Sequence, residues 1–226
     1  MFEGLSEYIR ENLQAKVTQQ GLNDYEIFGK EVESPVSDLI EEFLQEKGIK
    51  YSAVRAKSKN EFPDLKLTIG GVEYALEHKA GESSQGPNND MGTLNAYPNK
   101  IEKFGDRIFC TFVKYSKATK GNGIVVNDIY FDKIYTFVGT FASSQRNDIL
   151  KYRKKDGNLR PKVWNDFNSG AVYTGSLDEF KNNIDETVAY RAEQLVLQHI
   201  EDLTYESKVR VYDNLGKMIG KSSQED

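Results

Sequence analysis

The sequence is poor in cysteine and has no long apolar run. Its single cysteine, Cys110, cannot form an internal disulfide, and its apolar neighbours predict a buried structural thiol. No stretch of about eighteen apolar residues occurs, so we expect no membrane-spanning helix and no membrane partner. The first residues lead directly into charged sequence, without the apolar run of a secretory signal. We therefore expect a cytoplasmic protein.

Internal repeats and low-complexity tracts are also absent from the 226 residues. This length suits one domain with a sizeable core and is short for two. A hydrophobic content of 38% and a charged content of 29% are typical of a globular chain rather than a disordered one. We predict a single domain over residues 1–226, with a frayed tail at about 216–226.

The net charge of −5 argues against a surface that binds nucleic acid over its whole extent. The charges are unevenly distributed, however. Residues 31–46 contain six acidic residues and no basic one, which predicts a solvated face. Residues 145–162 contain seven basic residues and two acidic ones, so this segment is either a site of phosphate contacts or an ordinary solvated loop.

Apolar spacing predicts helices towards both ends of the chain. An amphipathic helix is expected at about 2–20, and another follows Ser34 and ends near Gly48. Ser176, with a glutamate three residues later, has the pattern of a capping box at the start of a last long helix.

Strands are predicted in the middle of the sequence. Apolar residues alternate at 65–69 and at 72–76, and the two runs are joined by Gly70-Gly71, which suits a two-residue hairpin turn. Further β-like runs occur at 107–115 and 128–138. The predicted fold class is α/β, with a mixed central β-sheet flanked by helices.

The hairpin carries the residues with the clearest chemistry. If its two glycines form the turn, Ile69 pairs with Val72 and Asp64 lies opposite Glu77. Directly opposed residues share a face of the sheet, with Cβ atoms roughly 5 Å apart. Lys79 is two residues beyond Glu77 and projects from that face too. The spacing therefore predicts two carboxylates and an ammonium close together.

Two carboxylates this close are tolerated only with a proton, a base or a metal between them. We expect Mg²⁺, because it prefers carboxylates and retains waters for phosphate oxygens. Asp64 and Glu77 are the predicted metal ligands, together with the backbone carbonyl of His78, whose side chain should point to the apolar face. Lys79 is expected to orient a water or to stabilise charge in the transition state of phosphate hydrolysis. The alternative is an exposed hairpin in which Asp64 and Lys79 form surface ion pairs.

Pro63-Asp64 followed by Glu77-His78-Lys79 resembles the motif of the PD-(D/E)xK nuclease superfamily, which includes most type II restriction endonucleases. The motif is short, and the predicted hairpin between its halves makes the match more specific. The resemblance implies a restriction-endonuclease-like fold and Asp64, Glu77 and Lys79 as catalytic residues. It also implies sequence-specific, Mg²⁺-dependent hydrolysis of double-stranded DNA by a homodimer, whose two sites cut two strands.

A weaker resemblance, to the blunt-cutting restriction enzymes, covers about two thirds of the chain. In those enzymes the helix before the catalytic hairpin carries an acid that can serve a second metal, and Glu33 is the candidate here. An acid at this place also complements the helix dipole, without any role in catalysis. The polar loop at about 81–95 resembles their DNA-contacting loop, and Gln85, Asn88 and Asn89 are candidates to bind phosphates or base edges.

A second loop, at about 145–170, combines basic, amide and aromatic residues and also suits DNA contact. Arg160 is its candidate DNA-binding residue, whereas Trp164 and Phe167 either contact DNA or anchor the loop to the core. Two other functions stay open: a repair or junction-resolving nuclease with the same site, and a DNA-binding module without catalysis. Two crowded carboxylates beside a lysine favour an enzyme.

Overall fold

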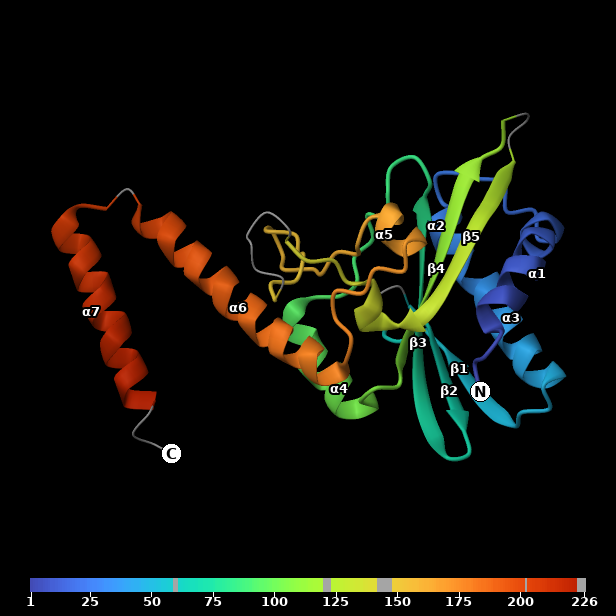
Figure 1. The fold of residues 1–226 in the computed structure, drawn as a ribbon, viewed down its shortest axis with the longest axis horizontal. Helices are drawn as coiled ribbons and strands as arrows, with labels where there is room; N and C mark the ends of the chain where they lie inside the picture. Colours follow the sequence, from blue (N-terminus) through green and yellow to red (C-terminus); the bar gives the residue numbers. More distant parts are fainter. Residues whose placement is uncertain (59–60, 120–122, 142–147, 202, 223–226) are drawn as a thin grey trace. The chain divides into compact units, whose positions relative to one another are not determined.

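In the part of the chain that the structure describes, five strands form one mixed β-sheet in the order β1-β2-β3-β4-β5 (Figure 1). The computed structural model describes residues 1–58, 61–119, 123–141, 148–201 and 203–222. Strands β3 and β4 are parallel, and the other neighbours are antiparallel. The strands are β1 Tyr51–Arg55, β2 Leu65–Ile69, β3 Val72–Glu82, β4 Ile108–Lys117 and β5 Ile124–Lys133.

Helices flank this sheet, which confirms the predicted fold class. The described helices are α1 Leu5–Gln19, α2 Phe28–Glu31, α3 Glu33–Glu46, η1 Leu94–Ala96, α4 Tyr97–Phe104, η2 Ile134–Phe137, α5 Trp164–Asn168, α6 Leu177–Ile200 and α7 Tyr205–Ser222. The chain forms two compact units, Met1–Ile184 and Asp185–Asp226, and the first contains the whole sheet. No described helix is both long enough and apolar enough to cross a membrane.

The hairpin of β2 and β3 has the predicted register. Ile69 pairs with Val72, and the pairing ends where Leu65 meets Leu76. The two turn glycines have φ angles of 58° and 81°, values that residues with a side chain rarely adopt. Strand β3 continues for six residues beyond Leu76, to Glu82, alongside β4. The end of the hairpin therefore leaves one side of β3 without a strand partner from β2.

Successive side chains of β3 point to opposite faces of the sheet and enter two different cores. Leu76 and Ala80 belong to a core formed with α1, α2 and α3 on one face. On the other face Gly81 lies against Trp164 of α5, and α4 packs on β3 (Figure 1). Glu77 and Lys79 share the face of Gly81, because they are four and two residues before it in the strand.

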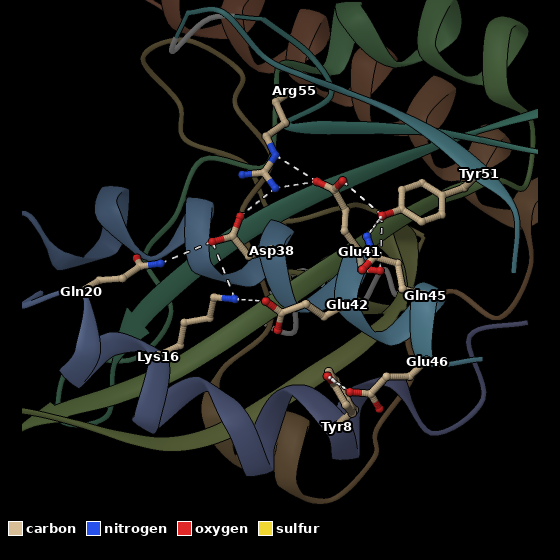
Figure 2. Close-up of polar contacts among 10 residues, drawn as sticks. All are labelled: Tyr8, Lys16, Gln20, Asp38, Glu41, Glu42, Gln45, Glu46, Tyr51 and Arg55. Carbon is tan, nitrogen blue, oxygen red and sulfur yellow. Dashed lines mark hydrogen bonds and ion pairs between the residues drawn. The ribbon is translucent and has the colours of Figure 1, made fainter. Parts of the chain in front are cut away.

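The acidic residues of α3 bind neighbouring elements (Figure 2). Arg55 of β1 forms ion pairs with Asp38 at 2.7 Å and with Glu41 at 2.5 Å. Lys16 of α1 forms an ion pair with Glu42. The predicted solvated face is therefore wrong for Asp38 and Glu41, whose side chains are 28% and 22% exposed, whereas Glu42 is 46% exposed. Their partners come from other elements, and a count of charges within residues 31–46 contains no information about them.

In the second half of the chain the start of α6 agrees with the prediction, whereas the end of β5 and the end of α7 differ from it. Ser176 caps α6 as expected, with a hydrogen bond of 3.2 Å from the Glu179 N–H to Ser176 Oγ. The strand predicted at 128–138 ends earlier, and residues 134–137 form the 3₁₀ turn η2, because four consecutive buried residues do not alternate between two faces. Helix α7 extends to Ser222 and so includes residues 216–222 of the expected tail, whereas residues 223–226 lie outside the described part.

Candidate active site

The predicted catalytic residues lie together where β2 and β3 separate. Strand pairing ends at Leu65 and Leu76, and the next residue on each strand, away from the turn, is Asp64 on one and Glu77 on the other. Beyond this point the backbone N–H of His78 donates a hydrogen bond of 2.7 Å to Asp64 Oδ2. A side-chain carboxylate thus replaces the strand partner of β3 and is held against that strand.

Lys79 lies between the two carboxylates. Its Nζ is 2.8 Å from Glu77 Oε1 and 4.0 Å from Asp64 Oδ2. The side chains of Lys79, Glu77 and Asp64 are 16%, 14% and 18% exposed, so these are not surface ion pairs. We call these three residues the catalytic cluster, after the role that the sequence predicts for them. It is largely removed from water but still open to a ligand.

The charge of Lys79 is fixed by its neighbours. Burial by itself lowers the pKa of the Lys79 ammonium, but the negative charges of Glu77 and Asp64 outweigh burial and raise this pKa above its ordinary value. Lys79 is therefore cationic at neutral pH. It is suited to stabilise negative charge on a substrate rather than to accept a proton.

The cluster contains an unsatisfied acceptor. Glu77 Oε2 is buried and has no hydrogen-bond partner, and a buried acceptor without a partner is costly. Within the described ranges, no three His, Cys, Asp or Glu side chains are close enough to hold a metal ion. The available donors are the Asp64 and Glu77 carboxylates and the His78 carbonyl, which faces the same side of β3 as the His78 N–H. Such a small set of oxygen ligands fits Mg²⁺, which retains several waters.

Glu33, the predicted second acid, is half-buried at the start of α3. Burial and, next, the negative charge of Asp64 raise the pKa of the Glu33 carboxyl to about 7, and the positive charge of Lys79 opposes them. Glu33 is thus electrostatically coupled to the catalytic cluster although it lies on a different element. It does not join Asp64 and Glu77 in a three-ligand group among the described residues.

The His78 side chain is on the opposite face of the sheet from Glu77 and Lys79, as expected. It is fully buried, and its Nε2 is 3.1 Å from Ser37 Oγ of α3. Burial lowers the pKa of the His78 imidazole to about 3. The ring is therefore neutral near pH 7, and its place in the α1–α3 core gives it a structural role.

Backbone hydrogen bonds join the two loops that the sequence assigns to DNA contact. The Met91 N–H donates to the Leu159 carbonyl at 3.1 Å, and the Leu159 N–H donates to the Gly92 carbonyl at 2.9 Å. A third bond, of 3.1 Å, connects the Leu94 N–H with the Gly157 carbonyl. The segments 91–94 and 157–159 therefore form one structural unit, although they are distant in the sequence.

Side chains of the predicted DNA-binding residues divide into two groups. Gln85 and Asn88 are exposed. Asn89 instead donates a hydrogen bond of 2.8 Å to a carbonyl of β3, and Arg160 donates one of 2.8 Å to the Asn88 carbonyl. Arg160 also forms an ion pair of 2.9 Å with Asp90. Asn89 and Arg160 thus hold the first loop in position.

The basic segment at 145–162 is not a uniform phosphate-binding surface. Lys154 and Lys155 are exposed, but Lys162 is 5% exposed and donates a hydrogen bond to a backbone carbonyl. Arg153 forms an ion pair of 3.2 Å with an aspartate of the other loop. Arg146 lies outside the described residues, as does the whole of 142–147.

Trp164 and Phe167 anchor the second loop to the core. The Trp164 indole N–H donates a hydrogen bond of 2.8 Å to the Glu82 carbonyl at the end of β3. The Phe167 ring stacks on Phe137, with centroids 5.3 Å apart. The close approach of Trp164 requires a glycine in β3, because a Cβ at Gly81 would be 2.8 Å from the indole ring.

Sequence reasoning does not identify Lys100, on α4. Its charge interacts with those of Glu77, Lys79 and Asp64, and its ammonium lies 3.7 Å from the centroid of the Phe62 ring. No motif or periodicity distinguishes this lysine from Lys103 on the same helix. Only the packing of α4 beside the hairpin brings it near the catalytic cluster.

The family model described as NgoBV restriction endonuclease matches residues 8–214. The chain belongs to the NgoBV restriction endonuclease family. Among solved structures, the NlaIV restriction endonuclease is similar, with 15% sequence identity and a TM-score of 0.47 over 79% of this chain and 76% of that one. Comparison with curated proteins gives no match.

As a member of the NgoBV restriction endonuclease family, the chain is a type II restriction endonuclease, a site-specific deoxyribonuclease that acts on double-stranded DNA. Enzymes of this kind depend on a metal. The predicted function is thereby confirmed. Family membership favours restriction over the two alternatives that the sequence left open, a repair nuclease and a module without catalysis.

Proposed function

We propose that this restriction endonuclease hydrolyses DNA at the catalytic cluster, with Asp64, Glu77 and the His78 carbonyl as ligands of Mg²⁺. The observation that supports this assignment is the arrangement of the two carboxylates around Lys79, with Glu77 Oε2 buried and lacking a partner. When bound, Mg²⁺ supplies Lewis-acid activation of water and phosphate. The two carboxylates would hold this ion beside Lys79.

Each residue of the cluster has a defined task in this proposal. Lys79, whose ammonium is held 2.8 Å from Glu77, stabilises the negative charge that develops on the phosphate. The His78 N–H donates a hydrogen bond of 2.7 Å to Asp64 and so orients its carboxylate before the substrate binds. Glu33, whose carboxyl pKa is raised to about 7, becomes available as a second acid when a metal favours its ionised form.

The two joined loops provide the DNA contacts of the proposal. Gln85 and Asn88 are exposed, and their amides both donate and accept hydrogen bonds, as base edges and phosphates require. Asn89 and Arg160 contribute by holding the loop that carries Gln85 and Asn88. Lys154, exposed in the second loop, is suited to a phosphate.

We further propose that the enzyme acts as a homodimer. One chain contributes one catalytic cluster in its described residues, whereas a duplex has two strands to cut. Two copies related by a twofold axis present two clusters to a palindromic site. Sedimentation of the enzyme with and without duplex DNA tests this. Double-strand cleavage by a species that stays monomeric on DNA contradicts it.

The test of the active site is cleavage of a mixed-sequence plasmid with Mg²⁺. The Glu77→Gln variant keeps the size of the side chain and removes its charge, so we expect cleavage to fall by ~100-fold or more. Glu73→Gln is the matched control, because Glu73 lies on the same face of the same strand and pairs with Lys66 at 2.8 Å. We expect discrete fragments from the wild type and the control, and none in EDTA.

A second readout follows metal binding without activity. Mg²⁺ should raise the melting temperature of the wild type and of Glu73→Gln, and should have little effect on Glu77→Gln, because a ligand that binds only the folded state stabilises it. Equal stabilisation of all three proteins would remove Glu77 from the metal site. Undiminished cleavage by Glu77→Gln would refute the proposed mechanism.

A further inference from the structure

Lys100 is held by aromatic rings. Its Nζ lies 3.7 Å from the centroid of the Phe62 ring and 5.1 Å from the centroid of the Tyr97 ring. Gly92 lies close to it as well, because a Cβ added there would be 3.0 Å from Nζ. Phe62 is two residues before Asp64 in the sequence, and Tyr97 is buried. The ammonium is thus positioned by the same segment that carries the first acid of the catalytic cluster.

The Lys100 ammonium has no carboxylate within ion-pair distance among the described residues. Burial is the largest effect on it and lowers its pKa, while the negative charge of Glu77 favours the charged form. Burial removes part of the hydration of this ammonium, and the aromatic faces compensate only part of that loss. The contacts of Lys100 therefore leave room for an anion.

The only anion that the established activity brings to this place is DNA. We propose that Lys100 is a phosphate-binding residue of the active site, whose ammonium contacts a backbone phosphate of the DNA strand held at the catalytic cluster. This inference rests on the proposed function of that cluster. Lys79 and Lys100 then place two positive charges near the DNA strand. Carboxylates hold the ammonium of Lys79, and aromatic rings hold that of Lys100.

A purely structural role gives different expectations. If Lys100 serves only to pack its methylene chain on Phe62 and Tyr97, Lys100→Met preserves that packing and changes no property of DNA binding. If the ammonium contacts a phosphate, Lys100→Met loses the contact and Lys100→Arg retains it. The matched control is Lys103→Met, on the same helix, because Lys103 is exposed and its charge acts on Glu73 instead.

The experiment measures binding of a mixed-sequence duplex, with Ca²⁺ in place of Mg²⁺, by fluorescence anisotropy at a series of salt concentrations. Each phosphate contact adds about 0.9 to the slope of log K against log salt. We expect Lys100→Met to reduce this slope by about 0.9 and to weaken binding ~10-fold at low salt. Lys100→Arg and Lys103→Met should each match the wild type, and the melting temperature of each variant verifies folding.

Cleavage with Mg²⁺ supplies a second readout. Loss of a contact made equally in the ground state and transition state raises KM and leaves kcat nearly unchanged. An unchanged salt slope in Lys100→Met, or an equal loss in Lys103→Met, would overturn the assignment. If the wild type binds DNA but does not cut it, the catalytic proposal fails while the slope still decides the role of Lys100. If the wild type does not bind DNA, both proposals fail.

Discussion

Replacing Glu33 by glutamine should stabilise the metal-free enzyme, and the gain should depend on pH. Burial and the nearby charge of Asp64 raise the pKa of Glu33 to about 7 in the folded state, from 4.5 in the unfolded chain. A raised carboxyl pKa means that the folded state binds this proton more tightly. The stability from Glu33 is therefore complete below about pH 4.5 and is lost as the pH rises to about 7.

The magnitude follows from this difference. A shift of one unit in a pKa corresponds to about 1.4 kcal/mol. The whole shift of Glu33, from 4.5 to about 7, therefore corresponds to about 3 kcal/mol of stability. Glu33 is only half-buried, and solvent screening reduces this to ~1–2 kcal/mol at pH 8. At pH 5 the carboxyl of the folded wild type is protonated. We therefore expect the gain in stability from Glu33→Gln to be only a few tenths of its value at pH 8.

The assay is urea unfolding of wild type, Glu33→Gln and Glu11→Gln at pH 5 and pH 8, with EDTA to exclude metal. Glu11 is exposed on α1, so its variant removes the same charge without removing a buried one. The competing explanation of Glu33 is a helix N-terminal acid, which predicts that glutamine is less stable at pH 8 by ~0.3–1 kcal/mol. A destabilised Glu33→Gln at pH 8, or an equal difference at both pH values, would show that the Glu33 carboxylate is not destabilised by burial and by Asp64.

Three further predictions follow from the packing of the site. Gly81→Ala should lower the free energy of unfolding by ~1–3 kcal/mol in urea, because the new Cβ overlaps the Trp164 ring at 2.8 Å; no change would mean that the ring moves freely. Arg160→Met should make the loop at 88–92 more sensitive to limited proteolysis without lowering the melting temperature of the protein. If the protease cuts this variant at the same rate as the wild type, Arg160 does not hold the loop. Burial keeps His78 neutral in the folded state, whereas the unfolded chain takes up a proton on this residue below its pKa of 6.5. In a Glu33→Gln background, the free energy of unfolding should therefore fall by about 1.4 kcal/mol for each pH unit below 6.5. His78→Gln should remove this dependence on pH.

The β2–β3 hairpin could be predicted because its geometry is local. A two-residue turn determines the register of the strands it joins, and the register determines which residues face one another. Asp64, Glu77 and Lys79 are therefore brought together by the position of two glycines in the sequence. The structure adds the hydrogen bond from the His78 backbone to Asp64, which no residue pattern contains.

Features that depend on distant segments could not be predicted in this way. The partners of the acidic α3 face, Arg55 and Lys16, come from β1 and α1. The two loops are joined by backbone hydrogen bonds across more than sixty residues, such as that from Met91 to Leu159. Lys100 belongs to the same class, since its role comes from the docking of α4. Charge counts and periodicity contain no information about such contacts.

The alternation of β3 explains why this site and the core depend on each other. Leu76, His78 and Ala80 fill the α1–α3 core, while Glu77 and Lys79 between them form the catalytic cluster on the other face. A slip of one residue in the register would move the two charges into the apolar core and the apolar residues out of it. The cost of burying those charges without partners is several kcal/mol per ion. The energy that prevents misregistration of the hairpin therefore also keeps Glu77 and Lys79 on one face of the sheet.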